Sequence, residues 1–221
     1  MTGASGSDRG ASLLVEISAA LGAGGGSPLE KVLARARDAV VAGELEALAV
    51  EEGLLQAYLF VGFPGVLEAF SAWRGAVPDE GLPAELEDDA GNREVRHEER
   101  GRRVCRAVYG AAYDRLRANV RRLHPALDRW MIREGYGKVL GRPGLDLAER
   151  ELCIVALLAA AGRGPQLHSH LRGALRNGAG AARTRAALEA GLARLLDPAR
   201  RDELESLWDR VLRSARQDGD V

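Results

Sequence analysis

Apolar residues recur along most of the chain at the three- and four-residue spacing of amphipathic helices, and alternating strand-like runs are almost absent. Alanine, leucine, arginine and glutamate dominate these stretches, and all four favour helices. The pattern therefore predicts an all-α fold. The predicted helices span residues 11–22, 28–42, 44–60, 64–74, 94–121, 124–134, 146–161, 165–177, 181–195 and 198–215.

One stretch interrupts this helical pattern strongly enough to predict a linker. Residues 75–93 are rich in proline, glycine and acidic residues. The linker separates an N-terminal helical segment, residues 11–74, from a longer C-terminal domain, residues 94–216. The small polar residues at 1–10 predict a disordered N-terminus, and residues 217–221 form a tail.

A weak internal echo crosses the linker. Residues 17–43 and 154–178 both run through an apolar helix, a glycine turn, a proline, an amphipathic helix and a final glycine. The first copy has Arg35 where the second has His170. A duplicated helical hairpin explains this echo, and so does a chance similarity of composition.

The charge balance and the lack of long apolar runs argue against some classes of function. The 31 basic and 32 acidic residues give a net charge of −1, which does not favour a nucleic-acid or membrane-surface partner. The arginines clustered between 100 and 122 are interleaved with acidic and apolar residues, as on a solvated helix face. No leader-like segment and no apolar run of about 18 residues is apparent, so we expect a cytoplasmic protein.

The two cysteines are too few and too far apart for metal or dithiol chemistry. Cys105 and Cys153 form no CxxC pair, so the minimum parts of a disulfide scaffold, a zinc site or a redox dithiol are missing. We therefore expect no metal site and no redox dithiol built on these cysteines.

Candidate chemistry begins at the helix predicted over 146–161. Asp146 and Glu149 form a capping-box-like start, and residues 152–161 are all apolar, which predicts a helix buried on every side. Glu151 lies at the edge of this buried stretch. It is either a carboxylate in a tuned, partly dry setting or an ordinary first-turn glutamate that faces water.

The following helix carries two histidines whose side chains cannot share a face. Leu167, Leu171 and Leu175 define its apolar stripe, and His170 lies on that stripe. The spacing predicts that His170 points inward and His168 outward. An inward histidine is either a hydrogen-bonded core residue or a catalytic group.

Two adjacent helices joined by the short turn at 162–165 must pack together, which would bring Glu151 and His170 into one pocket. A carboxylate and an imidazole are sufficient for proton transfer without a cofactor. The glycine-rich stretch 135–141 lacks the spacing of a phosphate loop and follows no strand. We expect it to be a loop at the pocket edge, with Arg142 available for an anionic group.

Residues 142–179 resemble the carboxymuconolactone decarboxylase family of the alkylhydroperoxidase D-like superfamily. The shared pattern is a loop ending in RPGL, a helix carrying RE, a short turn, and then QL-x-x-HLR-x-AL-x-NG. Residues 54–70, with the sequence GFP, also look like a helix of that family. The resemblance implies an AhpD-like multihelical bundle built from helical hairpins and assembled as a homo-oligomer.

The peroxidase branch of that superfamily relays protons through a glutamate, a CxxC pair and a histidine. Glu151 and His170 match the glutamate and histidine, but the cysteine positions fall on Arg163 and Gln166. Because a thiolate is the nucleophile of that reaction, the resemblance disfavours alkylhydroperoxidase activity.

The decarboxylase branch also lacks the CxxC pair and implies a cofactor-independent lyase acting on a small carboxylated, lactone-like substrate. In that interpretation His170 is the proton donor or relay, and Glu151 sets its tautomer and charge. Substrate carboxylates would bind Arg142, Arg150 or Arg163. The alternative is a non-catalytic helical oligomer, a degenerate member of the family in which His170 is merely packed.

Two further questions depend on residues in the N-terminal half. The GFP-like element occurs only there, so it reaches the site either within the chain or from a neighbouring subunit. The aromatic residues at 60, 63, 70 and 73 form either a core stripe or part of a subunit interface.

Overall fold

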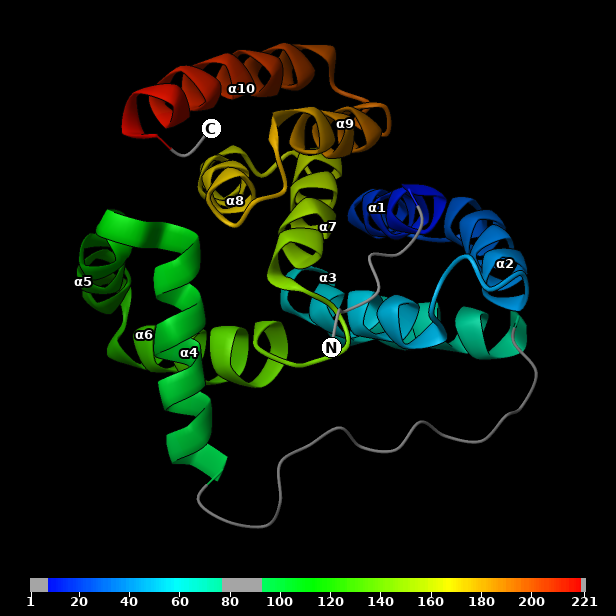
Figure 1. The fold of residues 1–221 in the computed structure, drawn as a ribbon, viewed down its shortest axis with the longest axis horizontal. Helices are drawn as coiled ribbons and strands as arrows, with labels where there is room; N and C mark the ends of the chain where they lie inside the picture. The colour runs from blue at the N-terminus through cyan, green and yellow to red at the C-terminus, as the bar shows by residue number, and fades with distance from the viewer. Residues whose placement is uncertain (1–7, 77–92, 220–221) are drawn as a thin grey trace.

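The computed structural model describes residues 8–76 and 93–219, and all regular structure in these ranges is helical (Figure 1). This confirms the predicted all-α class and the multihelical, AhpD-like bundle. The elements are α1 (Asp8–Gly22), α2 (Ser27–Val41), α3 (Ala47–Ala76), α4 (Arg93–Tyr109), η1 (Gly110–Ala112), α5 (Tyr113–Leu123), α6 (Pro125–Trp130), η2 (Met131–Leu140), α7 (Leu147–Ala160), α8 (Gly164–Arg176), α9 (Ala181–Leu192) and α10 (Pro198–Asp218).

Several predicted boundaries fall outside the described residues. Residues 1–7 of the predicted disordered N-terminus, residues 77–92 of the predicted linker, and residues 220–221 of the tail belong to this group. Where the structure describes parts of the predicted disordered N-terminus and the predicted tail, both segments are shorter than predicted. Helix α1 already begins at Asp8, and α10 continues to Asp218, so residues 8–10 and 217–218 are helical.

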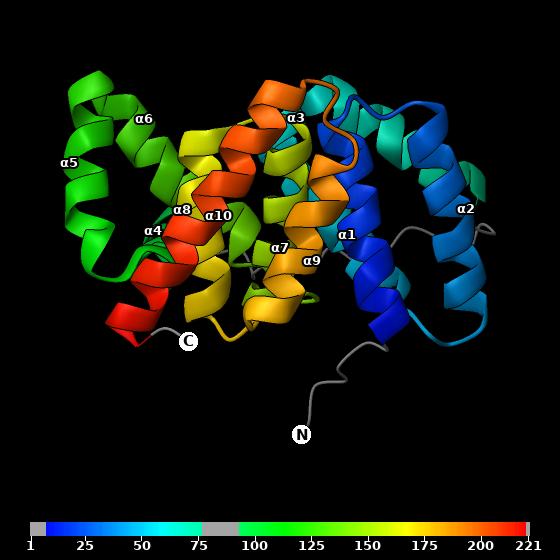
Figure 2. The same ribbon diagram turned by 90° about the horizontal axis from the view of Figure 1, so that it is seen from above.

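Helix α7 lies at the centre of the bundle. It packs against α1, α3, α8 and α9, and Figures 1 and 2 show these helices around it. Every residue from Arg150 to Ala160 is buried, which confirms the prediction of a helix buried on all sides. The Asp146 carboxylate accepts a hydrogen bond from the Glu149 main-chain N–H and so caps the helix start as expected.

The N-terminal segment is part of the same core. Helix α1 packs on α7 and α9, while α3 packs on α1, α7 and η2. One continuous cluster of buried apolar residues runs from α1 to α10. The N-terminal helices share this core because α7 is apolar on every face and must be buried on every face. Helices α1 and α3 pack against the faces of α7 that the C-terminal helices do not contact.

Each hairpin of the internal echo carries a polar contact between its two helices. Arg35 of α2 forms an ion pair with Glu16 of α1, with 2.6 Å between Nη1 and Oε2. His170 of α8 contacts Glu151 of α7. The two acids do not align, because Glu16 stands one residue before the first copy at 17–43 and Glu151 stands three residues before the second copy at 154–178. A duplicated hairpin and a chance similarity of composition therefore both still explain the echo.

One helix prediction and one loop prediction are wrong in the region between the hairpins. The helix predicted over 94–121 breaks at Gly110, whose φ of +53° only glycine adopts easily, and η1 turns the chain between α4 and α5. The stretch 135–141 is not a loop. It lies largely in η2, a π-helical continuation of α6 that packs against α4.

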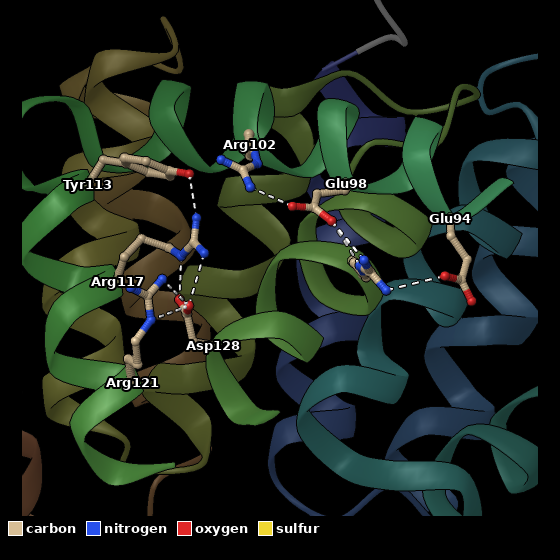
Figure 3. Close-up of polar contacts among 8 residues, drawn as sticks. Glu94, Glu98, Arg102, Tyr113, Arg117, Arg121 and Asp128 are labelled. Atoms are coloured by element: carbon tan, nitrogen blue, oxygen red, sulfur yellow. Dashed lines mark hydrogen bonds and ion pairs between the residues drawn. The ribbon is translucent and has the colours of Figure 1, made fainter. Parts of the chain in front are cut away.

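Ion pairs hold the arginine-bearing helices between residues 94 and 140 against one another (Figure 3). Asp128 on α6 is buried and accepts hydrogen bonds from both Arg117 and Arg121 on α5, with Nη2–Oδ2 distances of 2.9 and 2.8 Å. The hydrogen bonds from Arg117 hold the pKa of Asp128 below its usual value. Arg133 on η2 reaches Glu98 on α4. These arginines therefore join helices to one another.

Helix α3 departs from one expectation. Among the described residues it is the one helix long and apolar enough to cross a bilayer, whereas the sequence analysis expected no such stretch. A third of its most apolar window is buried, and the helix packs on α1, α2 and α7. A single helix of this kind is weak evidence for a membrane span, because core helices of soluble proteins meet the same criterion.

Candidate functional site

Glu151 and His170 form a buried pair, as the sequence predicts. The His170 Nδ1 atom lies 2.9 Å from Glu151 Oε2, and the pair joins α7 to α8. Glu151 is fully buried, which excludes the alternative of a first-turn glutamate in water. His170 is 5% exposed, whereas His168 is exposed, so the predicted orientations of both histidines are confirmed.

The pair has a definite polarity. A carboxylate is an acceptor, so a proton on Nδ1 directed at Glu151 leaves Nε2 as the ring atom able to exchange a proton with another molecule. The second carboxylate oxygen, Oε1, is buried without a hydrogen-bond partner among the described residues. This carboxylate oxygen therefore has capacity for a further hydrogen bond.

Gly173, one turn after His170 on α8, makes room for the carboxylate. A Cβ atom at this position would lie 2.5 Å from Glu151 Oε2 and 2.8 Å from a methyl group of Val108. Because real Cβ atoms do not approach other atoms so closely, a side chain here would displace the carboxylate. The sequence pattern gave this glycine no role, because it falls on an unspecified position, the x of HLR-x-AL.

Two aromatic rings flank the imidazole of His170. The ring of Phe60 on α3 packs edge-on against it, with 6.2 Å between centroids, and Tyr109 at the end of α4 packs similarly at 6.5 Å. Each ring lines a different hollow, Phe60 the larger and Tyr109 the smaller. His170 itself lines neither hollow, so one aromatic ring separates it from each.

The larger hollow, here called the large cavity, has a volume of about 1030 Å³. The C-terminal end of α1, the glycine turn before α2, the middle of α3, the end of α7 and the start of α8 surround it. Its wall includes Glu30, Phe60, Glu68, Arg163 and Gln166. Arg163 and Gln166 are the positions where the peroxidase branch carries its cysteines, and Gln166 lies one turn before His170.

The N-terminal half supplies the GFP-like element to this site within the same chain. Gly62 has φ +71° and ψ 178°, a conformation essentially restricted to glycine, and Pro64 follows it. Together they kink α3 beside the cavity, with Phe60 just before the kink. The α3 segment around this kink therefore lines the large cavity within one chain.

Two of the three predicted substrate arginines lie in a separate cluster at the start of α7. Arg150 is 1% exposed, and its Nη2 atom donates to Glu52 Oε2 at 2.8 Å and to the carbonyl oxygens of Arg142 and Pro143. Arg142 also donates to Glu52, at 3.0 Å. The Arg150 guanidinium is buried and bonded to the loop before α7. It is therefore not accessible to a substrate, contrary to the prediction.

Arg163 is the predicted arginine that the structure does place on a cavity wall. Its side chain is exposed at the turn between α7 and α8. Glu52, the buried partner of Arg142 and Arg150, was missed in the sequence. It is 98 residues from Arg150, and no local pattern links positions so far apart.

The sequence also gave no indication of a tyrosine cluster beside the pair. The ring of Tyr109 packs edge-on against that of Tyr136 on η2, with 6.2 Å between centroids, and Ser169 on α8 lines the smaller hollow together with Tyr109. Burial raises the pKa of Tyr109 and raises that of Tyr136 well above its usual value, so both phenols are neutral and available as hydrogen-bond donors at neutral pH. Polar groups therefore continue from the Glu151–His170 pair toward the smaller hollow.

The two cysteines are not placed for redox or metal chemistry. Both are buried, and burial raises the pKa of each thiol to about 12. Within residues 8–76 and 93–219, no three histidine, cysteine or acidic side chains gather closely enough to hold a metal ion. The catalytic candidates in the described residues are therefore the carboxylate, the imidazole and the phenols.

Part of the chain matches the model of a known protein family. Residues 110–205 match the model of the carboxymuconolactone decarboxylase family, a range that includes Glu151, His170, Arg142, Arg150 and Arg163. No curated protein matches the chain. Phe60 and the rest of α1–α3 lie outside the matched range, although they build most of the large cavity.

Proposed function

This chain belongs to the carboxymuconolactone decarboxylase family through residues 110–205, and from that premise we propose that it is a cofactor-independent lyase, or a related proton-transfer enzyme, acting on a small carboxylated, lactone-like substrate. The single observation that carries the proposal is the buried hydrogen bond between His170 and Glu151. A carboxylate that orients an imidazole is a common arrangement for general acid–base catalysis.

The proposed reaction needs few groups from the protein. Loss of CO₂ breaks one carbon–carbon bond, and the conjugated lactone takes up the electron pair as an enolate. His170, protonated on both ring nitrogens, then donates a proton from Nε2 to carbon while Glu151 holds Nδ1–H. Arg163, on the wall of the large cavity, is the predicted arginine that remains in place to bind a substrate carboxylate.

The large cavity is the proposed substrate site. Its volume exceeds that of a small carboxylated lactone, and Phe60 separates it from the imidazole by one ring. The proposal therefore requires Phe60 to move aside when substrate binds. A side-chain rotation of this kind is fast compared with enzyme turnover.

Variants of the pair test the proposal directly. His170→Ala and Glu151→Gln should each lower turnover of carboxymuconolactone or a related carboxylated lactone by about 10²-fold or more, because each removes one partner of the proton relay. CO₂ release measures the reaction. His97→Ala, a half-buried histidine on α4 away from both hollows, serves as the matched control and should retain full turnover.

Circular dichroism and thermal unfolding of each variant separate loss of catalysis from loss of folding. Full turnover by either folded variant contradicts the role given to that residue.

The alternative of a non-catalytic helical protein is favoured by one observation, that His170 lines neither hollow. Absence of turnover by the unmodified protein on every carboxylated lactone, with unfolding unchanged in His170→Leu, would support that alternative.

Peroxidase activity has no support from the site. The cysteine positions of that branch hold Arg163 and Gln166, and both cysteines of the chain are buried elsewhere.

The proposed homo-oligomer is supported by two apolar side chains just past the kink of α3. Phe63 and Leu67, one turn apart, are 65% and 64% exposed.

A further inference from the structure

We propose that the surface formed by the end of α5 and by α6 docks onto an anionic lipid bilayer. This surface, here called the α5–α6 surface, consists of the exposed apolar residues Leu123, Leu127 and Trp130 and the exposed arginines Arg122 and Arg129. Figures 1 and 2 both show α5 and α6 at one end of the molecule. The inference does not depend on the proposed function.

Three large apolar side chains of the α5–α6 surface are in contact with solvent. Leu123 is 78% exposed, Leu127 is 44% exposed and Trp130 is 60% exposed. Leu127 and Trp130 are three residues apart on α6 and therefore share a face, and Leu123 ends α5 at the corner just before α6. None of the three lines the large cavity or the smaller hollow. Exposed apolar residues that gather in this way are typical of an interaction site.

The fold holds this surface in one arrangement. Asp128, between Leu127 and Arg129, is buried and accepts hydrogen bonds from Arg117 and Arg121 of α5. These contacts fix α6 against α5, with Leu127 and Arg129 exposed on either side of Asp128 in the sequence. Little backbone order must therefore form when a partner binds, which lowers the entropic cost of binding.

The part of the chain that contains the α5–α6 surface is strongly basic. Residues 93–140 include 13 arginines and lysines and 6 aspartates and glutamates, a net charge of +7, whereas the whole chain has a net charge of −1. The net charge of the chain therefore averages two regions of opposite sign. A charge asymmetry of this kind is typical of proteins that bind membranes or nucleic acids, although the overall composition favours neither.

Two exposed arginines lie next to the apolar side chains. Arg129 forms no ion pair with any described residue, and Arg122 donates to the neutral amide oxygen of Asn119 at 2.6 Å. Both guanidinium groups can therefore bind an anionic group without breaking an ion pair. Lipid phosphates are anionic groups of the kind that arginine binds well.

An anionic bilayer matches both properties of the surface. Tryptophan is favoured at the boundary between lipid headgroups and acyl chains, leucine side chains are buried among the acyl chains, and arginines attract anionic headgroups. A second copy of the chain bound symmetrically at this surface would bring two arginine-rich surfaces together. A nucleic acid would pair with the arginines but would offer the two leucines little apolar surface.

Flotation of the full-length protein with lipid vesicles tests the proposal. Vesicles of equal parts phosphatidylglycerol and phosphatidylcholine should bind the protein at low ionic strength. Vesicles of phosphatidylcholine alone should bind it about tenfold more weakly or worse, because they carry no net charge to attract the arginines. Added salt should weaken binding to the anionic vesicles.

Trp130 provides a direct signal of docking. Trp73 and Trp208 are 0% and 5% exposed, so Trp130 is the tryptophan of this chain that water reaches. We expect the fluorescence emission to shift to shorter wavelength when anionic vesicles are added. Trp130→Phe should still float with the vesicles but should lose this shift.

A pair of apolar variants tests the inserted side chains. Leu127→Ser combined with Trp130→Ser should weaken binding to anionic vesicles by about tenfold or more, because both apolar side chains are lost from the lipid contact. Leu196→Ser, which alters a 93% exposed apolar residue between α9 and α10, is the matched control and should bind normally.

A pair of charge variants tests the arginines. Arg122→Gln combined with Arg129→Gln should also weaken binding by about tenfold or more. Lys31→Gln combined with Arg37→Gln, which removes two exposed charges from α2 at the opposite end of the molecule, is the matched control and should bind normally (Figure 2). Unfolding curves establish that each variant is folded.

Three results would overturn the proposal. The first is that the unmodified protein floats with neither kind of vesicle, or equally with both. The second is that Leu127→Ser, Trp130→Ser floats like the unmodified protein while Phe63→Ser, Leu67→Ser does not, which would assign docking to α3. The third is that the protein binds no vesicles and the α6 variant has a lower mass in solution, which would make this surface a contact between copies.

Discussion

A missing side chain decides where the Glu151 carboxylate lies. Gly173 faces Glu151 across the α7–α8 contact, and the space that a Cβ would take is occupied by the carboxylate and by Val108. The hydrogen bond to His170 therefore depends on a third residue that carries no chemistry of its own. Residue-level tests should separate this spatial role from the chemical roles of Glu151 and His170.

Gly173→Ala should break the Glu151–His170 contact while leaving both groups in the chain. We expect a loss of about 1–3 kcal/mol in the free energy of unfolding, because the added methyl overpacks a closed contact. Chemical denaturation measures the loss, and the His170 ring resonance reports the contact. Gly135→Ala, at a helical position with open space around it, is the control and should change neither. An unchanged His170 resonance in Gly173→Ala would contradict the spatial role.

The two cysteines allow a second test at the same scale. With thiol pKa values of about 12, only about one thiol in 10⁴ is ionised at pH 8. We expect Cys105 and Cys153 to resist a disulfide reagent such as dithiobis(nitrobenzoate) in the folded protein, and to react fully in guanidinium chloride. Rapid labelling of the folded protein would show that a thiol is accessible and would reopen the question of thiol chemistry.

At the scale of elements, the contact between α3 and the start of α7 depends on a buried charge cluster. Glu52 and Arg150 are each 1% exposed and are joined by a 2.8 Å ion pair. Gln56, one turn further along α3, donates to the Arg150 carbonyl oxygen. Removing one charge of such a pair leaves the other buried without compensation.

Glu52→Ala should therefore lower the free energy of unfolding by about 3–5 kcal/mol. The double variant Glu52→Ala, Arg150→Met should recover part of that loss, because the most deeply buried guanidinium of the cluster is removed together with its carboxylate. Arg9→Ala, which breaks the exposed pair with Glu44, is the control and should cost less than about 1 kcal/mol. Equal effects of Glu52→Ala and Arg9→Ala would mean that the buried cluster does not anchor these elements.

The sequence predicted those elements that local patterns determine. Helical periodicity located both hairpins, and the apolar stripe of α8 predicted which histidine points inward. The break at Gly110 and the π-helical η2 were missed, since arginine-rich amphipathic patterns continue through both. Arg150 was assigned to substrate because its partner Glu52 lies far away in the sequence. Long-range pairing is not visible in local periodicity.

For the whole molecule, the exposed apolar side chains of α3 bear on assembly. The aromatic stripe of this helix divides in the structure, with Trp73 fully buried and Phe63 largely exposed. Leu67 extends the exposed part by one turn. We therefore interpret Trp73 as a core residue and place Phe63 and Leu67 at the proposed subunit interface.

Light scattering after size exclusion should give a mass that is a multiple of the 23.6 kDa chain. Phe63→Glu combined with Leu67→Glu should reduce that mass to one chain, because charged side chains disfavour burial in an interface. Val41→Glu, which alters an equally exposed apolar residue on α2, is the control and should leave the assembly intact. A single-chain mass for the unmodified protein would rule out the homo-oligomer.

The first hairpin carries the Glu16–Arg35 ion pair between α1 and α2, and the second carries the Glu151–His170 contact between α7 and α8. The side chains of Arg35 and Glu16 are 56% and 29% exposed, whereas those of His170 and Glu151 are 6% and 0% exposed. Ions in solution can screen the first contact but have little access to the second. Added salt should therefore weaken the contact between α1 and α2 and leave the contact between α7 and α8 unchanged.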